Sequence, residues 1–169
     1  MEYLHKIEKL EDKEDLLWNI PEQKQGDINI IGGNLQNFRT SVKVAELLTA
    51  NYPLKTINVV LPDALKNKLP PLPNLVFLSS TDSGSLANAT EITNTLDSAD
   101  FNLLVGDFSK NSITTQAIAE ACQKTTKQAI VTRDTVDLLT EGKTERILMN
   151  ENLILMGSDH CPVSIDLEF

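Results

Sequence analysis

Gly26-Asp27-Ile28-Asn29-Ile30-Ile31-Gly32-Gly33-Asn34 is the stretch of sequence that decides the fold. It predicts a short strand of β-branched residues that is broken by two glycines and a polar residue. Further apolar runs, most of them separated by helical stripes of apolar residues, follow at 56–61, 74–78, 101–105, 128–131 and 146–156. Strands that alternate with helices are typical of βαβ units and a parallel sheet.

The predicted strands are almost continuously apolar, as expected of strands that helices cover on both faces. We therefore expect an α/β fold with three α/β/α layers and a largely parallel sheet. The length of 169 residues favours one domain, which we place at 26–169. Leu4, Ile7 and Leu10 recur at a spacing of three, so we interpret residues 1–25 as an N-terminal helix and an extended arm. We expect Trp18 to pack this arm onto the domain.

The charge and hydropathy of the chain exclude some classes of partner. The net charge of −9 repels phosphate backbones at long range, so we expect no nucleic-acid partner. No stretch approaches the ~18 apolar residues of a membrane span. Residues 1–15 are charged and lack the apolar run of a signal peptide. We therefore expect a cytoplasmic protein that binds a small molecule and has no membrane partner.

The cysteines predict neither a disulfide framework nor a metal site. Cys122 lies in an apolar helical pattern, and no CxxC pair is present. Asp159-His160-Cys161 contains a nucleophile and a base, but adjacent residues on an extended strand point to opposite faces. A surface turn before Pro162 is the favoured interpretation, and the sequence indicates no catalytic residue.

The loops that follow the predicted strands are the candidate binding sites. In open α/β sheets, ligands bind beyond the carboxyl ends of the strands. Five loops meet this rule, at 32–37, 61–63, 79–84, 106–111 and 132–134. They are rich in glycine, serine, threonine, asparagine and aspartate, which also suit ordinary turns and helix caps.

Gly32-Gly33-Asn34 is the most suggestive of these loops. Two glycines after a strand let the backbone approach a ligand and expose its N–H groups. Neither the GxGxxG nor the GxxxxGK[ST] nucleotide motif is present. The alternative interpretation is a tight strand-to-helix turn.

Two further loops place charged groups before predicted helices. Asp107, Lys110 and Asn111 precede a helix that starts near Ser112. Lys110 could meet a phosphate there, whereas Asn111 or Ser112 could be the N-cap and Asp107 could favour the positive end of the helix. Asp134 could bind a sugar hydroxyl, a metal ion or a helix N-terminus, of which capping is favoured.

The order of these motifs resembles the N-terminal half of the ADP/ATP-dependent NAD(P)H-hydrate dehydratase family. This family is carbohydrate-kinase-related and is part of the ribokinase-like superfamily. The matching residues begin with the stretch from Gly26 to Asn34, followed by Phe38 and Thr40-Ser41. The family usually has Gly-Gly-Ser, an aromatic residue and Gly-Ala at these positions.

The resemblance continues to about residue 139. Val59-Val60-Leu61-Pro62-Asp63 matches a strand that leads to a proline-containing loop. Ala99-Asp100 precedes the strand that ends at Gly106, where the family has Gly-Pro-Gly-Leu-Gly and only this glycine is kept. Val131-Thr132-Arg133-Asp134 stands where the family has a strand ending in Asp-Ala-Asp.

The resemblance implies a partial ribokinase-like fold and a role in nicotinamide-nucleotide repair. The family dehydrates hydrated NADH or NADPH, using ADP or ATP, with Mg, to phosphorylate the unwanted hydroxyl. Together with the loop positions, it predicts ten substrate-binding residues: Gly32, Gly33, Asn34, Thr40, Ser41, Gly106, Asp107, Lys110, Asn111 and Asp134.

The sequence also departs from the family. It has no Gly-Ser-Gly-Asp-like motif, which carries the phosphoryl step, and Leu155-Met156-Gly157-Ser158 stands roughly at the family's Thr-Pro-His. Three hypotheses follow: a repair enzyme whose phosphoryl-transfer half is missing, a non-catalytic nucleotide-binding, small-molecule-binding or oligomeric scaffold domain, and a homo-oligomer that completes its site with a neighbour. The missing motif favours the second, because phosphoryl transfer depends on placed charge-stabilising groups.

Overall fold

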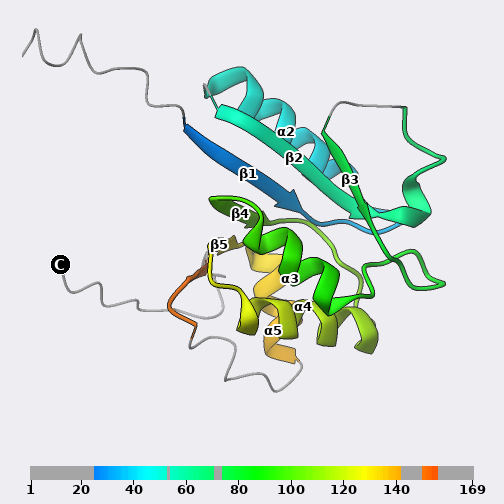
Figure 1. The fold of residues 1–169 in the computed structure, drawn as a ribbon. Helices are drawn as coiled ribbons and strands as arrows, with labels where there is room; N and C mark the ends of the chain where they lie inside the picture. Colours follow the sequence, from blue (N-terminus) through cyan, green and yellow to red (C-terminus); the bar gives the residue numbers. More distant parts are fainter. Residues whose placement is uncertain (1–24, 53, 71–73, 142–149, 156–169) are drawn as a thin grey trace, which may run out of the picture.

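The computed structural model describes residues 25–52, 54–70, 74–141 and 150–155 (Figure 1). The expected N-terminal helix and arm, and the Asp159-His160-Cys161 triplet, lie outside these ranges. The strands are β1 Gln25–Ile31, β2 Leu54–Pro62, β3 Leu75–Leu78, β4 Phe101–Leu104, β5 Gln128–Val131 and β6 Leu153–Leu155. The helices are α2 Arg39–Asn51, α3 Ala89–Asp97, α4 Ser112–Lys124 and α5 Arg133–Glu141, with the 3₁₀ turn η1 at Asp63–Leu65.

The six strands form one sheet in the order β3-β2-β1-β4-β5-β6, and each neighbouring pair is parallel. The chain therefore builds the sheet outward from β1 to β3, returns to the middle at β4, and builds outward again to β6. This order is that of a doubly wound sheet, whose switch point lies between β1 and β4. The predicted α/β class and parallel sheet are confirmed.

The register of the two central strands brings their ends together. Ile28 pairs with Phe101, and Ile31 pairs with Leu104. Both strands therefore end at the same level of the sheet, and the loops that follow them start side by side.

Helices cover the two faces of the sheet unequally. Ile31, Leu104 and Val131 point to one face and pack with α3, α4 and α5 in a single buried cluster. Ile30 and Val59 point to the other face, where they pack with residues of α2. Figure 1 shows α2 lying along β2, with α3, α4 and α5 grouped on the far side of the sheet. The predicted three α/β/α layers are therefore present.

Two asparagines within strands fix the end of α3. Asn29 donates its amide to the Thr95 carbonyl oxygen at 2.6 Å, and Asn102 donates to the Leu96 carbonyl oxygen at 2.9 Å. The last carbonyl groups of a helix have no partner inside the helix, so these amides satisfy them within the buried layer. They hold the carboxyl end of α3 against β1 and β4.

Asparagine side chains also start α3 and α4. Asn88 accepts from the N–H groups of Thr90 and Glu91, and Asn111 accepts from the N–H of Thr114 at 2.8 Å. Asn111 rather than Ser112 is therefore the N-cap of α4. No helix within the described ranges has the length and apolar character needed to cross a membrane.

Candidate functional site

The glycine pair after β1 allows two loops to touch. A Cβ atom added to Gly32 would lie 1.8 Å from the Val105 carbonyl oxygen, at the end of β4. Gly33 has a φ of +96°, and its Cβ would lie 2.9 Å from the Phe38 Cα. The two glycines therefore serve the tight strand-to-helix turn and the close contact between the loops, and neither lines the crevice described below.

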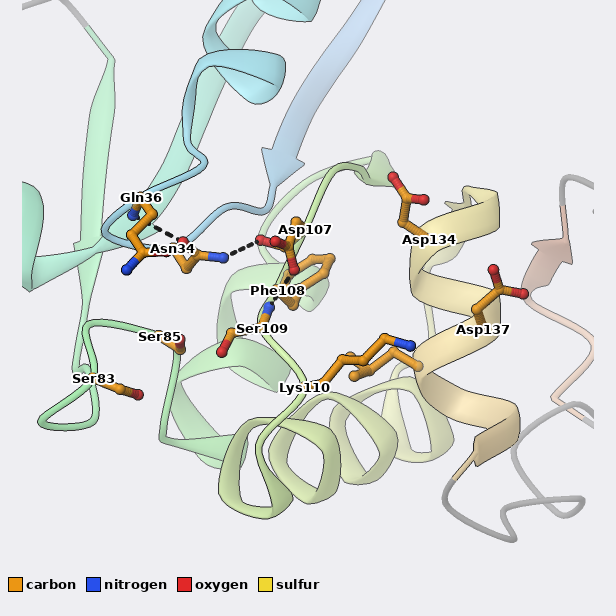
Figure 2. Close-up of a pocket in the computed structure, with 11 residues that line it drawn as sticks. Asn34, Gln36, Ser83, Ser85, Asp107, Phe108, Ser109, Lys110, Asp134 and Asp137 are labelled. Carbon is orange, nitrogen blue, oxygen red and sulfur yellow. Dashed lines mark hydrogen bonds between the residues drawn. The ribbon is translucent and has the colours of Figure 1, made fainter.

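Asn34 joins the β1 loop to the β4 loop. Its side-chain oxygen accepts from the N–H groups of Gln36 at 2.9 Å and Asn37 at 3.0 Å, which closes the turn. Its amide donates to the Asp107 carbonyl oxygen at 3.0 Å, and the side chain is buried. Figure 2 shows the two residues facing each other across the switch point.

The Asp107 carboxylate is held by groups from both loops. It accepts from the Ser109 N–H at 2.7 Å and from the Asn37 amide at 3.0 Å. Partial burial alone would raise the pKa of Asp107, but these hydrogen bonds, a contribution from Asn34 and the charge of Lys110 outweigh it. The pKa of Asp107 is therefore below its usual value, and the group is ionised at neutral pH.

These loops form one wall of a crevice of about 620 Å³ above the carboxyl ends of the central strands. This volume lies in the range of small-molecule sites. The lining is mainly polar and comes from four loops or helix ends: Asn34, Gln36, Ser83, Ser85, Asp107, Phe108, Ser109, Lys110, Asp134, Asp137 and Leu138. Figure 2 shows the labelled members around the opening.

Helix α5 forms the opposite wall. Asp134 and Asp137 are three residues apart, so they lie on one face of the helix, next to Leu138. Asp134 lies inside the first turn of α5, which begins at Arg133, rather than at the capping position before it. A carboxylate in the first turn is favoured by the positive end of the helix.

The loop between β3 and α3 supplies the third wall. Gly84 has a φ of +77°, and its carbonyl oxygen accepts from the Leu35 N–H at 2.9 Å, which ties this loop to the β1 loop. Thr114 of α4 donates to the Leu86 carbonyl oxygen at 2.8 Å. Ser85 is thereby buried, and its hydroxyl has no hydrogen-bond partner among the described residues.

The structure brings four of the ten predicted binding residues together in the crevice: Asn34, Asp107, Lys110 and Asp134. The other six support the walls without lining them. Thr40 is exposed at the start of α2 and lies beside Gly106, while Ser41 is buried beneath Gly32. Gly106 has a φ of +83° in the β4 loop, and Asn111 caps α4.

Three lining residues lie outside the loops selected from the sequence: Ser85, Asp137 and Leu138. The spacing of Asp137 from Asp134 would have indicated a shared helix face. Nothing in the sequence singled out Ser85, whose place depends on the contact between Leu35 and Gly84.

Metal-binding groups do not gather in the described part of the chain. Within these residues, no group of three or more histidine, cysteine, aspartate or glutamate side chains could hold a metal ion.

The sequence matches no protein-family model and no curated protein.

Proposed function

We propose that this chain binds a nucleotide in the crevice above β1 and β4. The ligand class is the one that the resemblance to NAD(P)H-hydrate dehydratases implies: a nicotinamide nucleotide, such as hydrated NADH or NADPH, or ADP or ATP with Mg. In this proposal the chain acts as a binding domain and does not by itself transfer a phosphoryl group.

The contact between the two central loops is the observation that carries this proposal. Asn34 and Asp107 meet at the switch point of a doubly wound sheet, which is where such sheets bind ligands. The same two residues line a crevice large enough for a small molecule. Hydrogen bonds hold both loops in place, so little ordering would be needed on binding.

The charge of the lining indicates which part of a nucleotide would bind there. Asp107, Asp134 and Asp137 contribute three carboxylates, and Lys110 is the only cationic residue of the described lining. Carboxylates accept hydrogen bonds from hydroxyl groups and repel bare phosphates. A ribose therefore suits the acidic side of the crevice, and phosphates suit the Lys110 side or need a magnesium ion.

The same charge balance supports binding without phosphoryl transfer. That reaction requires positive groups or hydrogen-bond donors aimed at the charge that develops on the transferred group. Lys110 alone supplies positive charge among the described lining residues, and the Gly-Ser-Gly-Asp-like motif is missing from the sequence. A catalytic role would therefore need positive groups from outside these described lining residues.

Thermal unfolding in the presence of candidate ligands tests the proposal. ADP, ATP, NAD⁺, adenosine and inorganic phosphate should be compared with and without Mg. A ligand present at 100 times its dissociation constant stabilises the native state by about 2.7 kcal/mol. We expect nucleotides and adenosine to raise the melting temperature and inorganic phosphate to leave it unchanged.

Two variants show whether a shift arises from the crevice. Asp134→Asn removes a lining carboxylate and should weaken nucleotide binding in calorimetric titration. Glu46→Gln removes an equal charge on exposed α2, outside the crevice, and should bind as the unaltered chain does. No change in melting temperature with any nucleotide, or equal loss in both variants, would contradict the proposal.

A further inference from the structure

No helix of the described residues covers one face of the sheet over its β4, β5 and β6 half, which is called the bare face below. Phe101, Ile130 and Ile154 lie on these three strands with 49%, 37% and 43% of their surface exposed. Ile130 pairs with both Leu103 and Ile154, so their side chains point to the same face. The three strands therefore present a continuous apolar surface to solvent.

The cover provided by α2 stops at the middle of the sheet. Along the row Ile30, Leu103, Ile130 and Ile154, the first residue is fully buried, the second is half-buried, and the last two are exposed. Helices α3, α4 and α5 pack on the opposite face. Strands of parallel sheets are normally covered on both faces, so the described part of the chain leaves this half of the sheet without one layer.

We propose that residues 1–24 of this chain cover the bare face. The chain reaches the sheet at Gln25, where β1 starts, and Ile28 of β1 pairs directly with Phe101 of β4. The segment before β1 therefore arrives beside the bare strands. This inference is independent of the proposed ligand, because the crevice lies at the carboxyl ends of the strands.

The apolar helix face predicted in this segment is about as long as the bare face is wide. Leu4, Ile7 and Leu10 recur at the spacing of one helix face, and six residues of helix rise about 9 Å. The two gaps between β4, β5 and β6 span about 10 Å at about 4.8 Å each. Fourteen residues separate Leu10 from Gln25, which is more than enough chain to reach the far strand.

A second copy of the chain fits this face less well. The bare strands have only three or four residues each, so the face measures about 14 Å by about 13 Å. A stable dimer buries about 800 Å² on each partner, several times this footprint. One short helix is enough to fill it.

Trp18 makes the proposal testable, because it is the only tryptophan of the chain. A nitroxide attached to Gln128→Cys, in a Cys161→Ser background, would sit on the bare face without removing any of its apolar side chains. Gln128 is exposed on β5, and its pairing with Phe101 places it on the same face. The remaining cysteine, Cys122, is buried.

The full-length labelled protein should lose most of its Trp18 fluorescence relative to the same protein carrying a diamagnetic label. The matched control is Gln116→Cys on α4, an exposed position on the opposite layer, where the nitroxide should leave the fluorescence nearly unchanged. Equal Trp18 fluorescence in the two nitroxide-labelled variants would overturn the proposal.

A mixing experiment shows whether the segment that covers the bare face belongs to the same chain or to a second copy. Labelled protein that also carries Trp18→Phe is added to unlabelled protein, so that any quenching must occur between chains. Fluorescence that stays constant in the mixture, together with quenching that does not change on dilution in the singly labelled protein, supports the proposal. Quenching in the mixture would overturn it in favour of a dimer.

Discussion

Asn34 and Asp107 are 73 residues apart in the chain and are joined by a hydrogen bond, with the Asn34 amide donating to the Asp107 carbonyl oxygen at 3.0 Å. A second bond runs from the Asn37 amide to the Asp107 carboxylate at 3.0 Å. These two bonds connect the halves of the doubly wound sheet at the point where their loops meet. Both halves of the sheet therefore contribute to this wall of the crevice.

Asn34→Ala should lower the free energy of unfolding by about 2 kcal/mol, because it leaves the Gln36 and Asn37 N–H groups and the Asp107 carbonyl oxygen without their partner. Urea unfolding followed by circular dichroism measures this change. Gln36→Ala is the control, since this exposed side chain should contribute less than about 0.5 kcal/mol. Similar losses in the two variants would show that the Asn34 bonds do not hold the loops together.

The Asp107 carboxylate should make stability depend on pH in acid. Its pKa is below 3.8 in the folded chain, so the ionised form is the one that folding favours. The stabilisation is present above about pH 4 and is lost as the pH falls through the folded pKa. It should be below about 1 kcal/mol, because the side chain is exposed to solvent.

Melting temperatures of the unaltered chain and Asp107→Asn, measured between pH 7 and pH 2.5, test this dependence. The difference between them should be largest near neutral pH and should shrink as the pH falls. Glu46→Gln serves as the control for removing one negative charge. A difference that grows toward low pH would refute the assigned direction.

Gly32→Ala should destabilise the fold by about 3 kcal/mol or more, because the new methyl group would overlap the Val105 carbonyl oxygen of the neighbouring loop. The matched variant is Gly106→Ala, whose Cβ would meet Thr40 at 3.4 Å, an ordinary contact. Its positive φ alone should cost about 1 to 2 kcal/mol. Denaturant midpoints give both values, and equal losses would be inconsistent with the close contact between the loops.

The Cys122 thiol should be unreactive in the folded protein. Burial raises its pKa from 9.0 to about 12, so almost no thiolate is present at neutral pH. In a Cys161→Ser background, alkylation followed by mass spectrometry should proceed only at urea concentrations that unfold the chain. Rapid alkylation without denaturant would mean that α4 opens locally.

The sequence was sufficient to predict the layers and most of the strands, because buried parallel strands leave apolar runs such as Leu75–Leu78. The order of the strands in the sheet could not be predicted, because a local sequence pattern does not indicate which strands are neighbours. The buried Asn29 and Asn102 also could not be interpreted, because their role depends on carbonyl groups at the end of α3. The bare half of the sheet likewise emerges only from the packing.

Only part of the candidate site could be predicted, because the rest also depends on contacts between distant parts of the chain. The strand-end rule selected Asn34, Asp107, Lys110 and Asp134, which line the crevice. It also selected both glycines of the β1 loop, whose role is to permit close packing. Distinguishing a residue that lines a crevice from one that shapes it requires distances between loops that are distant in the chain.

The unequal lengths of the strands suggest the order in which parts of the sheet unfold locally. β1 and β2 have seven and nine residues and paired neighbours on both sides, whereas the outermost strands β3 and β6 have four and three residues. Backbone amides of the two outermost strands should therefore exchange their hydrogens first, and those of β1 and β2 should exchange last. The crevice wall that contains Asn34 follows one of the most slowly exchanging strands, so it would keep its shape during motions that displace the wall after β3.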